Sequence, residues 1–322
     1  MKNLNGKSAL VTGAASGIGR AIALELARRQ VDLFLVDLDQ AGLAETADMA
    51  GKHHCQTIAH VADLTQPSDL SGIVERLLAR WNGVDILINN AGVAFYGSTH
   101  AMSDSQWQRI LAVNLLAPIE LTRKLLPSML ERYEAHVLNV CSIAGLVASP
   151  RLAAYHTTKF GLVGFSEALR AEYGPRGLGV TALCPGFVRT NIYRTAMIAG
   201  DKSMPRVPAW CTTSPEHVAS RAVRAIRGVE GVVVVTPAAQ LSWWLKRFAP
   251  GLIDLMYQFR WRKRAKAPVV ATNGDRLAVG SQAGLSMDAP PAECAVDAAA
   301  APDWSVQSLT PRSPAGSEHR AA

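Results

Sequence analysis

The feature that most constrains this chain is a repeated alternation between short apolar runs and longer segments with helical periodicity. Most of the runs are apolar throughout, which is typical of strands covered on both faces. The clearest runs are at residues 8–12, 31–36, 84–88, 136–140, 179–183 and 231–235. Helical segments lie between them, at 18–29, 69–81, 104–132 and 154–173, and Ser214-Pro215 begins another. This order predicts an α/β fold with a doubly wound parallel sheet.

Composition narrows the class of protein further. The chain has 322 residues, of which 49% are hydrophobic and 18% charged, so it can bury a large core. Its five cysteines are scattered, with no CxxC pair, which argues against a disulfide scaffold and a zinc site, and we expect no metal. The first residues lack the apolar stretch of a signal peptide, so we expect a cytoplasmic protein.

The positive charge is concentrated in one segment near the C-terminus. Residues 243–266 contain seven basic residues and one acid, and so contribute +6 of the net charge of +7. A basic balance confined to so short a segment describes that segment and not the domain. No nucleic-acid-binding motif accompanies it, and we expect no nucleic-acid partner.

The composition and the periodicity of the sequence change after Pro237, and this change divides the chain into three predicted parts. Residues 1–238 would form the main domain, 239–267 a basic amphipathic helical extension, and 268–322 a disordered tail rich in Ala, Pro and Ser. Leu241, Trp244, Leu245 and Phe248 share one helical face. Tryptophans beside basic residues are typical of an interfacial anchor, so residues 241–266 are expected at a membrane surface. The alternative is that these helices pack on the core or on a second subunit.

A glycine-rich turn follows the first apolar run directly and leads into a helix. It reads Thr12-Gly13-Ala14-Ala15-Ser16-Gly17-Ile18-Gly19. Glycines at such a junction let the backbone approach a pyrophosphate, whose charge then lies at the positive end of the helix. The turn alone is a weak signal, but at the start of a doubly wound sheet it predicts a Rossmann-type dinucleotide site.

Asp37 ends the second apolar run, 18 residues after Gly19. A carboxylate there accepts hydrogen bonds from the adenosine ribose and repels a 2′-phosphate, so NAD is favoured over NADP. Ser16 supports this preference, because it stands where a lysine or arginine could pair with that phosphate. The alternative is that Asp37 merely caps the loop that also contains Asp39.

A tyrosine and a lysine four residues apart begin the helical segment at 154–173. Tyr155 and Lys159 therefore lie on one helical face, and the ammonium group would favour the phenolate form of the tyrosine. Ser142 follows a strand and is expected at the carboxyl edge of the sheet, where ligands bind in open α/β folds. Its hydroxyl group could hold a substrate oxygen.

Further motifs occur in a fixed order along the chain. Asn89-Asn90-Ala91-Gly92 follows the strand at 84–88, Asn114 lies within a helix, and Pro185-Gly186-Phe187-Val188-Arg189-Thr190 follows the strand at 179–183. Together with the glycine turn and the Tyr-Lys pair, this set resembles the short-chain dehydrogenase/reductase family over residues 6 to about 237.

The resemblance implies a role for each matching residue. Tyr155 would be the general acid/base, Lys159 would bind the nicotinamide ribose and lower the pKa of Tyr155, and Ser142 would orient the substrate oxygen. Asn114 would complete a proton relay through water. The implied cofactor-binding residues are Gly13, Ser16, Gly17, Ile18, Gly19, Asp37, Asp63, Leu64, Asn90, Ala91, Gly92, Tyr155, Lys159, Pro185, Gly186, Val188 and Thr190.

The substrate is less constrained than the reaction. The resemblance makes 191–213 a substrate-covering loop, and its apolar residues favour an apolar alcohol or ketone, such as a steroid, retinoid or fatty-chain derivative. The same residues could instead pack only on the protein. Alternatives are a reductase of 3-oxoacyl thioesters or small diketones, or a non-catalytic NAD-binding scaffold. The resemblance also implies a homodimer or homotetramer.

Overall fold

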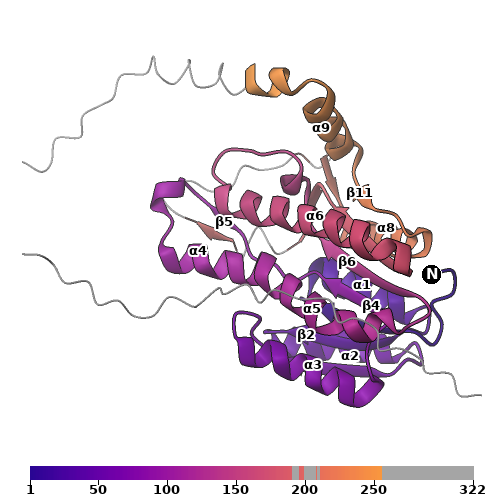
Figure 1. The fold of residues 1–322 in the computed structure, drawn as a ribbon. Helices are drawn as coiled ribbons and strands as arrows, with labels where there is room; N and C mark the ends of the chain where they lie inside the picture. Colours follow the sequence, from indigo (N-terminus) through magenta and orange to yellow (C-terminus); the bar gives the residue numbers. More distant parts are fainter. Residues whose placement is uncertain (191–195, 199–207, 209–210, 256–322) are drawn as a thin grey trace, which may run out of the picture. The chain divides into compact units, whose positions relative to one another are not determined.

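The computed structural model describes residues 1–190, 196–198, 208 and 211–255. Its central feature is a parallel sheet in the order β11-β7-β6-β4-β1-β2-β3 (Figure 1). Every pairing in this sheet is parallel, and the chain reverses its direction of winding between β1 and β4, as in the predicted doubly wound fold. The strands are β1 (Ser8–Thr12), β2 (Asp32–Asp37), β3 (Thr57–Val61), β4 (Ile86–Asn89), β6 (Ala135–Val140), β7 (Leu178–Cys184) and β11 (Val232–Val234).

Helices bury both faces of this sheet. One apolar cluster joins the sheet to α1 (Gly17–Ala27), α2 (Gln40–Gly51) and α8 (Pro215–Gly228). A second cluster, on the other face, joins it to α3 (Pro67–Trp81), α5 (Ala117–Leu130) and α6 (Ala153–Tyr173). Burial on both faces explains why β1, β4, β6 and β7, which are buried at every position, are mostly apolar.

The strand β3 is absent from the six clear runs in the sequence. It lies at the edge of the sheet and pairs with β2 alone, and its residues are only partly buried. An edge strand with Thr57 and His60 in five residues lacks the continuous apolar character of the central strands, which explains why the pattern was weak.

The helix expected over 104–132 is interrupted at its centre. Helix α4 (Asp104–Leu111) passes into a π-helical turn, Ala112–Leu116, and then into α5. Pro118 follows this turn, and because proline has no N–H it cannot continue the ordinary bonding to the carbonyl four residues earlier. That carbonyl belongs to Asn114, so the irregularity lies at a predicted site residue.

Two short ladders lie outside the main sheet. Strand β5 (Phe95–Tyr96) pairs with β9 (Met197–Ile198), and β8 (Phe187–Val188) pairs with β10 (Thr212–Thr213). Residues 197–198 and 212–213 belong to the expected substrate-covering loop, and the two ladders attach them to residues 95–96 and 187–188. The other apolar residues of that prediction, Ile192, Tyr193, Met204, Val207 and Trp210, lie outside the described residues.

After β11 the chain forms α9 (Pro237–Phe248), and residues 250–255 are helical again. The structure does not describe the predicted tail at 268–322. It also does not describe the part of the predicted helical extension after residue 255, which holds Phe259 and the basic residues from Arg260 to Lys266. Among the helices the structure describes, none combines the length and the apolar character that a membrane span requires.

Candidate functional site

The glycine turn is held tightly against the start of the loop after β4. A Cβ atom on Gly13, whose φ is +67°, would lie 2.7 Å from Nδ2 of Asn90, and one on Gly19 would collide with the carbonyl oxygen of Gly13. Asn90 donates hydrogen bonds from Nδ2 to the carbonyl oxygens of Thr12 (2.9 Å) and Gly13 (3.0 Å). Only glycine fits at these two positions, which explains the spacing seen in the sequence.

A cleft runs from this turn along the carboxyl ends of β1, β2 and β4. We call it the adenosine cleft, and it brings together these predicted cofactor-binding residues: Gly13, Ser16, Gly17, Asp37, Asp63, Leu64, Asn90, Ala91 and Gly92. This is the crevice at the reversal of strand order where ligands bind in such sheets. Gly19 does not line the cleft. It instead packs closely against the carbonyl oxygen of Gly13.

Asp37 lies in the wall of this cleft and also holds the glycine turn. Its Oδ2 accepts a hydrogen bond from the backbone N–H of Ala15 at 2.9 Å, and its Oδ1 accepts one from the N–H of Asp39 at 3.1 Å. Asp39 in turn caps α2 by accepting from the N–H of Gly42. Both sequence interpretations of Asp37 therefore have a structural counterpart, a carboxylate in the cleft and a capped loop.

A second pocket continues from the first, sharing Asn90, Gly92 and Thr190 with it. It brings together residues that lie far apart in the chain, from α1, the ends of β6 and β7, and the first turns of α6. The predicted residues that line it are Ile18, Asn90, Gly92, Ser142, Tyr155, Lys159, Pro185, Gly186, Val188 and Thr190.

Lys159 is a buried cation at the back of this pocket. Only 3% of its surface is exposed, and its Nζ donates a hydrogen bond to the carbonyl oxygen of Val140 at 2.8 Å. The same Nζ lies 5.8 Å from the centre of the Tyr155 ring. Burial lowers the pKa of Lys159, because removing the ammonium group from water disfavours its charged form. A buried amine with a lowered pKa beside a phenol is typical of a catalytic site.

Asn114 lies behind the pocket and does not line it. Its side chain is fully buried, accepts from the N–H of Val93 and donates to the carbonyl oxygen of Val93, both at 2.8 Å. It also donates to Oγ1 of Thr158 at 3.3 Å. The side chain therefore joins the loop after β4 to α6, and the backbone carbonyl of Asn114 cannot accept a hydrogen bond from Pro118, which has no N–H.

Ser142 and His156 shape the loop between β6 and α6. Ser142 Oγ accepts from the N–H of Ala144 at 3.1 Å and caps the short helix Ile143–Gly145. The ring of His156 bridges the carbonyl oxygen of Ala144 (2.7 Å from Nδ1) and the N–H of Ser149, which donates to Nε2 at 2.8 Å. His156 thus ties α6 to the loop and has no free ring nitrogen to act as a base.

The structure adds residues that the sequence did not indicate. Arg109 and Val113 reach the adenosine cleft from α4 and the π-helical turn, and Val140 and Cys141 line the second pocket. No local motif marks Arg109, since its position depends on how α4 lies across the sheet edge. Among the described residues no three His, Cys, Asp or Glu side chains gather as metal ligands.

The strand order and the cleft at its reversal define a Rossmann-type nucleotide-binding protein. Residues 7–198 match the model of the short chain dehydrogenase family, and the chain belongs to that family of oxidoreductases. This confirms both the resemblance and the fold expected from the sequence.

Two curated relatives illustrate the range of substrates in this family. The chain is 33% identical over 268 residues to a ketoacyl reductase, HetN, of Nostoc sp., covering 81% of this chain and 91% of that protein. It is 31% identical over 252 residues to estradiol 17-beta-dehydrogenase 11 of Homo sapiens, covering 77% and 81%.

Two solved structures illustrate the cofactors. A short chain dehydrogenase/reductase from Burkholderia phymatum in complex with NAD superposes with a TM-score of 0.70 at 26% identity, covering 78% of this chain and 96% of that one. A short-chain dehydrogenase from Sphingobium yanoikuyae in complex with NADPH gives 0.64 at 26% identity, covering 84% and 99%. Similar folds therefore carry either cofactor.

Proposed function

We propose that this oxidoreductase interconverts a secondary alcohol and a ketone, with Tyr155 as the general acid/base. The observation that carries the proposal is the pocket in which Ser142, Tyr155 and the buried Lys159 converge beside the adenosine cleft. A non-catalytic scaffold would not need a lysine buried at the cost of a lowered pKa.

In this proposal Ser142 holds the substrate oxygen and Tyr155 takes the hydroxyl proton, or returns it in the reverse direction. The charge of Lys159 favours the phenolate, and Asn114 completes a proton relay through water. A bound nicotinamide dinucleotide would supply the hydride chemistry. Positioned proton transfer of this kind contributes roughly 10² to 10⁴-fold to the rate.

The glycine turn would bind the pyrophosphate, with Gly13, Ser16, Gly17 and Ile18 around it. Asp63 and Leu64 would flank the adenine, and Val188 and Thr190 would hold the carboxamide. We propose NAD as the preferred cofactor, because the carboxylate of Asp37 in the adenosine cleft would repel a 2′-phosphate. NADP is the alternative.

The proposed substrate is lipophilic, a steroid, retinoid or fatty-chain derivative. Phe95, Ile110 and Ala154 form an apolar cluster with Val93, Trp107 and Met197, so Met197, in the described part of the loop, packs on apolar residues beside the site. A 3-oxoacyl thioester is the second candidate, favoured by the likeness to the ketoacyl reductase HetN.

We further propose a cytoplasmic homodimer or homotetramer that associates with membrane surfaces through residues 241–266. Light scattering of the purified protein gives the oligomeric state. A single mass equal to one chain would contradict the oligomer.

Hydride transfer measured with NAD and NADP in parallel tests the function. The alcohols should run from short diols to steroid and retinoid alcohols, with the corresponding ketones and a 3-oxoacyl thioester for the reverse reaction. We expect turnover of the bulky alcohols with NAD. Turnover of the thioester alone would favour the second candidate, and no turnover of any compound would contradict the oxidoreductase proposal.

A further inference from the structure

Helix α9 presents an apolar face that nothing in the described part of the chain covers. Leu241 is 72% exposed, Trp244 59% and Phe248 74%, and the rings of Trp244 and Phe248 lie 5.9 Å apart. Leu252 and Leu255 extend the exposed apolar surface into the helical residues 250–255. We call these five residues the outer face. Large exposed apolar residues elsewhere in the described chain are more scattered, and a contiguous apolar surface marks an interaction site.

The opposite side of α9 packs on the catalytic end of the sheet. Ala239 is buried, and Trp243 packs on the cluster that contains Cys141, which follows β6, and Cys184, the last residue of β7. Thr236 caps α9 by accepting from the N–H of Ala239 at 3.3 Å. A Cβ atom on Gly186, in the wall of the substrate pocket, would collide with Thr236 and lie 3.2 Å from Cβ of Ala239. The first turn of α9 is therefore part of the structure behind that wall.

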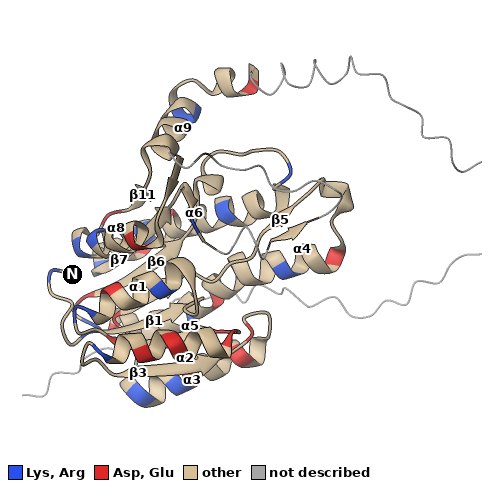
Figure 2. Cartoon of the chain, turned by 180° about the vertical axis from the view of Figure 1, so that it is seen from behind, with Lys and Arg blue, Asp and Glu red and all other residues tan. Residues whose placement is uncertain are grey.

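Charge indicates what covers the outer face. Lys246 and Arg247 stand between Trp244 and Phe248 in the sequence of α9, and the Arg247 guanidinium lies 6.0 Å from the centre of the ring of Trp243, which packs inward. Figure 2 shows the basic residues on α9 and one acidic residue, Asp254, in the short helix after it. Tryptophan and phenylalanine flanked by cations fit the interface of an anionic bilayer, whereas a second copy of the same face would bring like charges together.

We propose that the outer face docks on an anionic lipid surface and that the active site draws its alcohol or ketone directly from that lipid. The inference rests on the proposed reaction and specifies its substrate as a compound dissolved in the bilayer. One helix separates the lipid-facing side of α9 from the pocket wall at Gly186, a thickness of about 10 Å. Docking by the outer face would therefore hold the pocket close to the lipid, where a substrate partitioned into the membrane is concentrated.

The first test measures docking with the full-length protein. Vesicles of equal parts phosphatidylcholine and phosphatidylglycerol are sedimented with the wild type and with the double variant Trp244→Ser/Phe248→Ser. We expect the double variant to bind about tenfold more weakly or worse, because it removes two aromatic side chains from the interface. Tyr133→Ser is the matched control, since Tyr133 is a 96% exposed aromatic residue on another surface and its loss should leave binding unchanged.

Thermal unfolding of both variants checks that the fold is intact, since the outer-face side chains lie in solvent. Equal sedimentation of the wild type and the double variant would overturn the docking surface. So would a double variant that dissociates a wild-type oligomer while the wild type ignores the vesicles, which would assign the face to a second copy of the chain.

The second test separates substrate delivery from the reaction itself. The kcat/KM of the wild type is measured for a long-chain secondary alkanol carried in the vesicles and for its short water-soluble homologue. We expect the double variant to lose about tenfold in kcat/KM on the vesicle-borne alkanol and to keep its rate on the short homologue within about twofold. Equal rates of wild type and double variant on the vesicle-borne alkanol would overturn the inference while leaving the reaction intact. Absence of turnover with both alkanols in the wild type would instead contradict the proposed function.

Discussion

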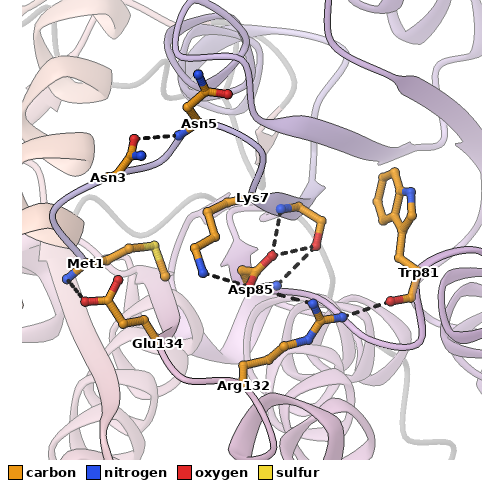
Figure 3. Close-up of polar contacts among 9 residues, drawn as sticks. Met1, Asn3, Asn5, Lys7, Trp81, Asp85, Arg132 and Glu134 are labelled. Carbon is orange, nitrogen blue, oxygen red and sulfur yellow. Dashed lines mark hydrogen bonds and ion pairs between the residues drawn. The ribbon is translucent and has the colours of Figure 1, made fainter.

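The parallel strands begin at one edge of the sheet, the amino edge, and end at the opposite one, the carboxyl edge. Both edges bury charged or titratable groups, but the contacts that these groups make differ between the two. At the amino edge, Asp85 accepts from the N–H (2.9 Å) and the hydroxyl group (3.0 Å) of Ser8 (Figure 3). Lys7 and Arg132 add ion pairs at 3.3 and 3.8 Å. Asp85 thus has partners from two separate parts of the chain, residues 7–8 and Arg132, and holds them together.

At the carboxyl edge, Lys159 has one hydrogen-bonded partner given by the structure, the carbonyl of Val140, and its ammonium group faces a pocket. Asp37 likewise lines a cleft while it holds a loop. An ionised group with spare bonding capacity beside a pocket is suited to chemistry, whereas one surrounded by partners is suited to stability. Substitutions at the two edges should therefore affect different measurements.

The largest effect is expected at the carboxyl edge, for Tyr155→Phe. Removing the hydroxyl group removes the proposed acid/base, so kcat should fall roughly 10² to 10⁴-fold. The dissociation constant of NAD and the melting temperature should change little, because the ring is retained. Stopped-flow hydride transfer and calorimetric binding measure the two quantities, and a variant with nearly wild-type kcat would contradict the mechanism.

The second-largest effect is expected at the amino edge and is a dependence of the free energy of unfolding on pH. His136 is fully buried beside Asp85, and burial is the main cause that lowers its pKa to about 3, with the N-terminal amine and Arg170 adding to the shift. The unfolded chain, with a pKa near ~6.5, binds a proton that the folded chain does not. Stability from this group is therefore complete above about pH 6.5 and is lost on acidification, by about 1.4 kcal/mol per pH unit down to about pH 3.

Urea unfolding at several pH values measures this slope. His136→Gln replaces the titrating ring by an amide that can still donate to Oγ1 of Thr181, now 2.9 Å from Nε2. The variant should be less stable at neutral pH but should show a shallower loss between pH 6 and 4. An unchanged slope would mean that another group is responsible for the acid sensitivity.

A smaller effect on stability is expected for Asp85→Asn. The amide can still accept from Ser8, but it no longer neutralises Lys7 and Arg132. Since both of these cations are partly exposed to water, we expect a loss of about 1–2 kcal/mol of unfolding free energy. The kcat should stay within about twofold, because Asp85 lies at the opposite edge from the pocket. Glu120→Gln, which breaks exposed pairs with Arg123 and Lys124, is the control and should cost less.

The sequence was sufficient to predict the central strands and the glycine turn because their physical requirements are local. A strand covered on both faces is buried at every position and is therefore mostly apolar, and Gly13 must be glycine because Asn90 and Ala91 leave no space for a Cβ atom. The site residues came together for a related reason, since the carboxyl ends of parallel strands share one edge.

What the sequence could not predict depends on tertiary contacts. The π-helical turn at Asn114 breaks a helix whose periodicity looked continuous, and the capture of its side chain by Val93 requires the loop after β4. Leu245 and Trp243 show the same limit in α9. The periodicity grouped Leu245 with Leu241, Trp244 and Phe248, and the tryptophans of this segment were expected at a membrane surface, whereas in the structure Leu245 is half-buried and Trp243 packs inward.

The smallest predicted effect concerns Asp37 at the carboxyl edge, which has a structural role and a proposed binding role. Asp37→Asn keeps an oxygen that can accept from the N–H of Ala15 but removes the negative charge from the adenosine cleft. If repulsion of a 2′-phosphate sets the cofactor preference, the ratio of kcat/KM for NAD over NADP should fall about tenfold, or about 1.4 kcal/mol.

Asp39→Asn is the matched control, because Asp39 lines the same cleft and caps α2, a bond that asparagine also makes. Its ratio should change less than that of Asp37→Asn. Equal changes in both variants would show that the general negative charge of the cleft selects the cofactor. No change in either would leave Asp37 with the single role of holding the glycine turn, and the carboxyl edge would then contain a structural carboxylate like the one at the amino edge.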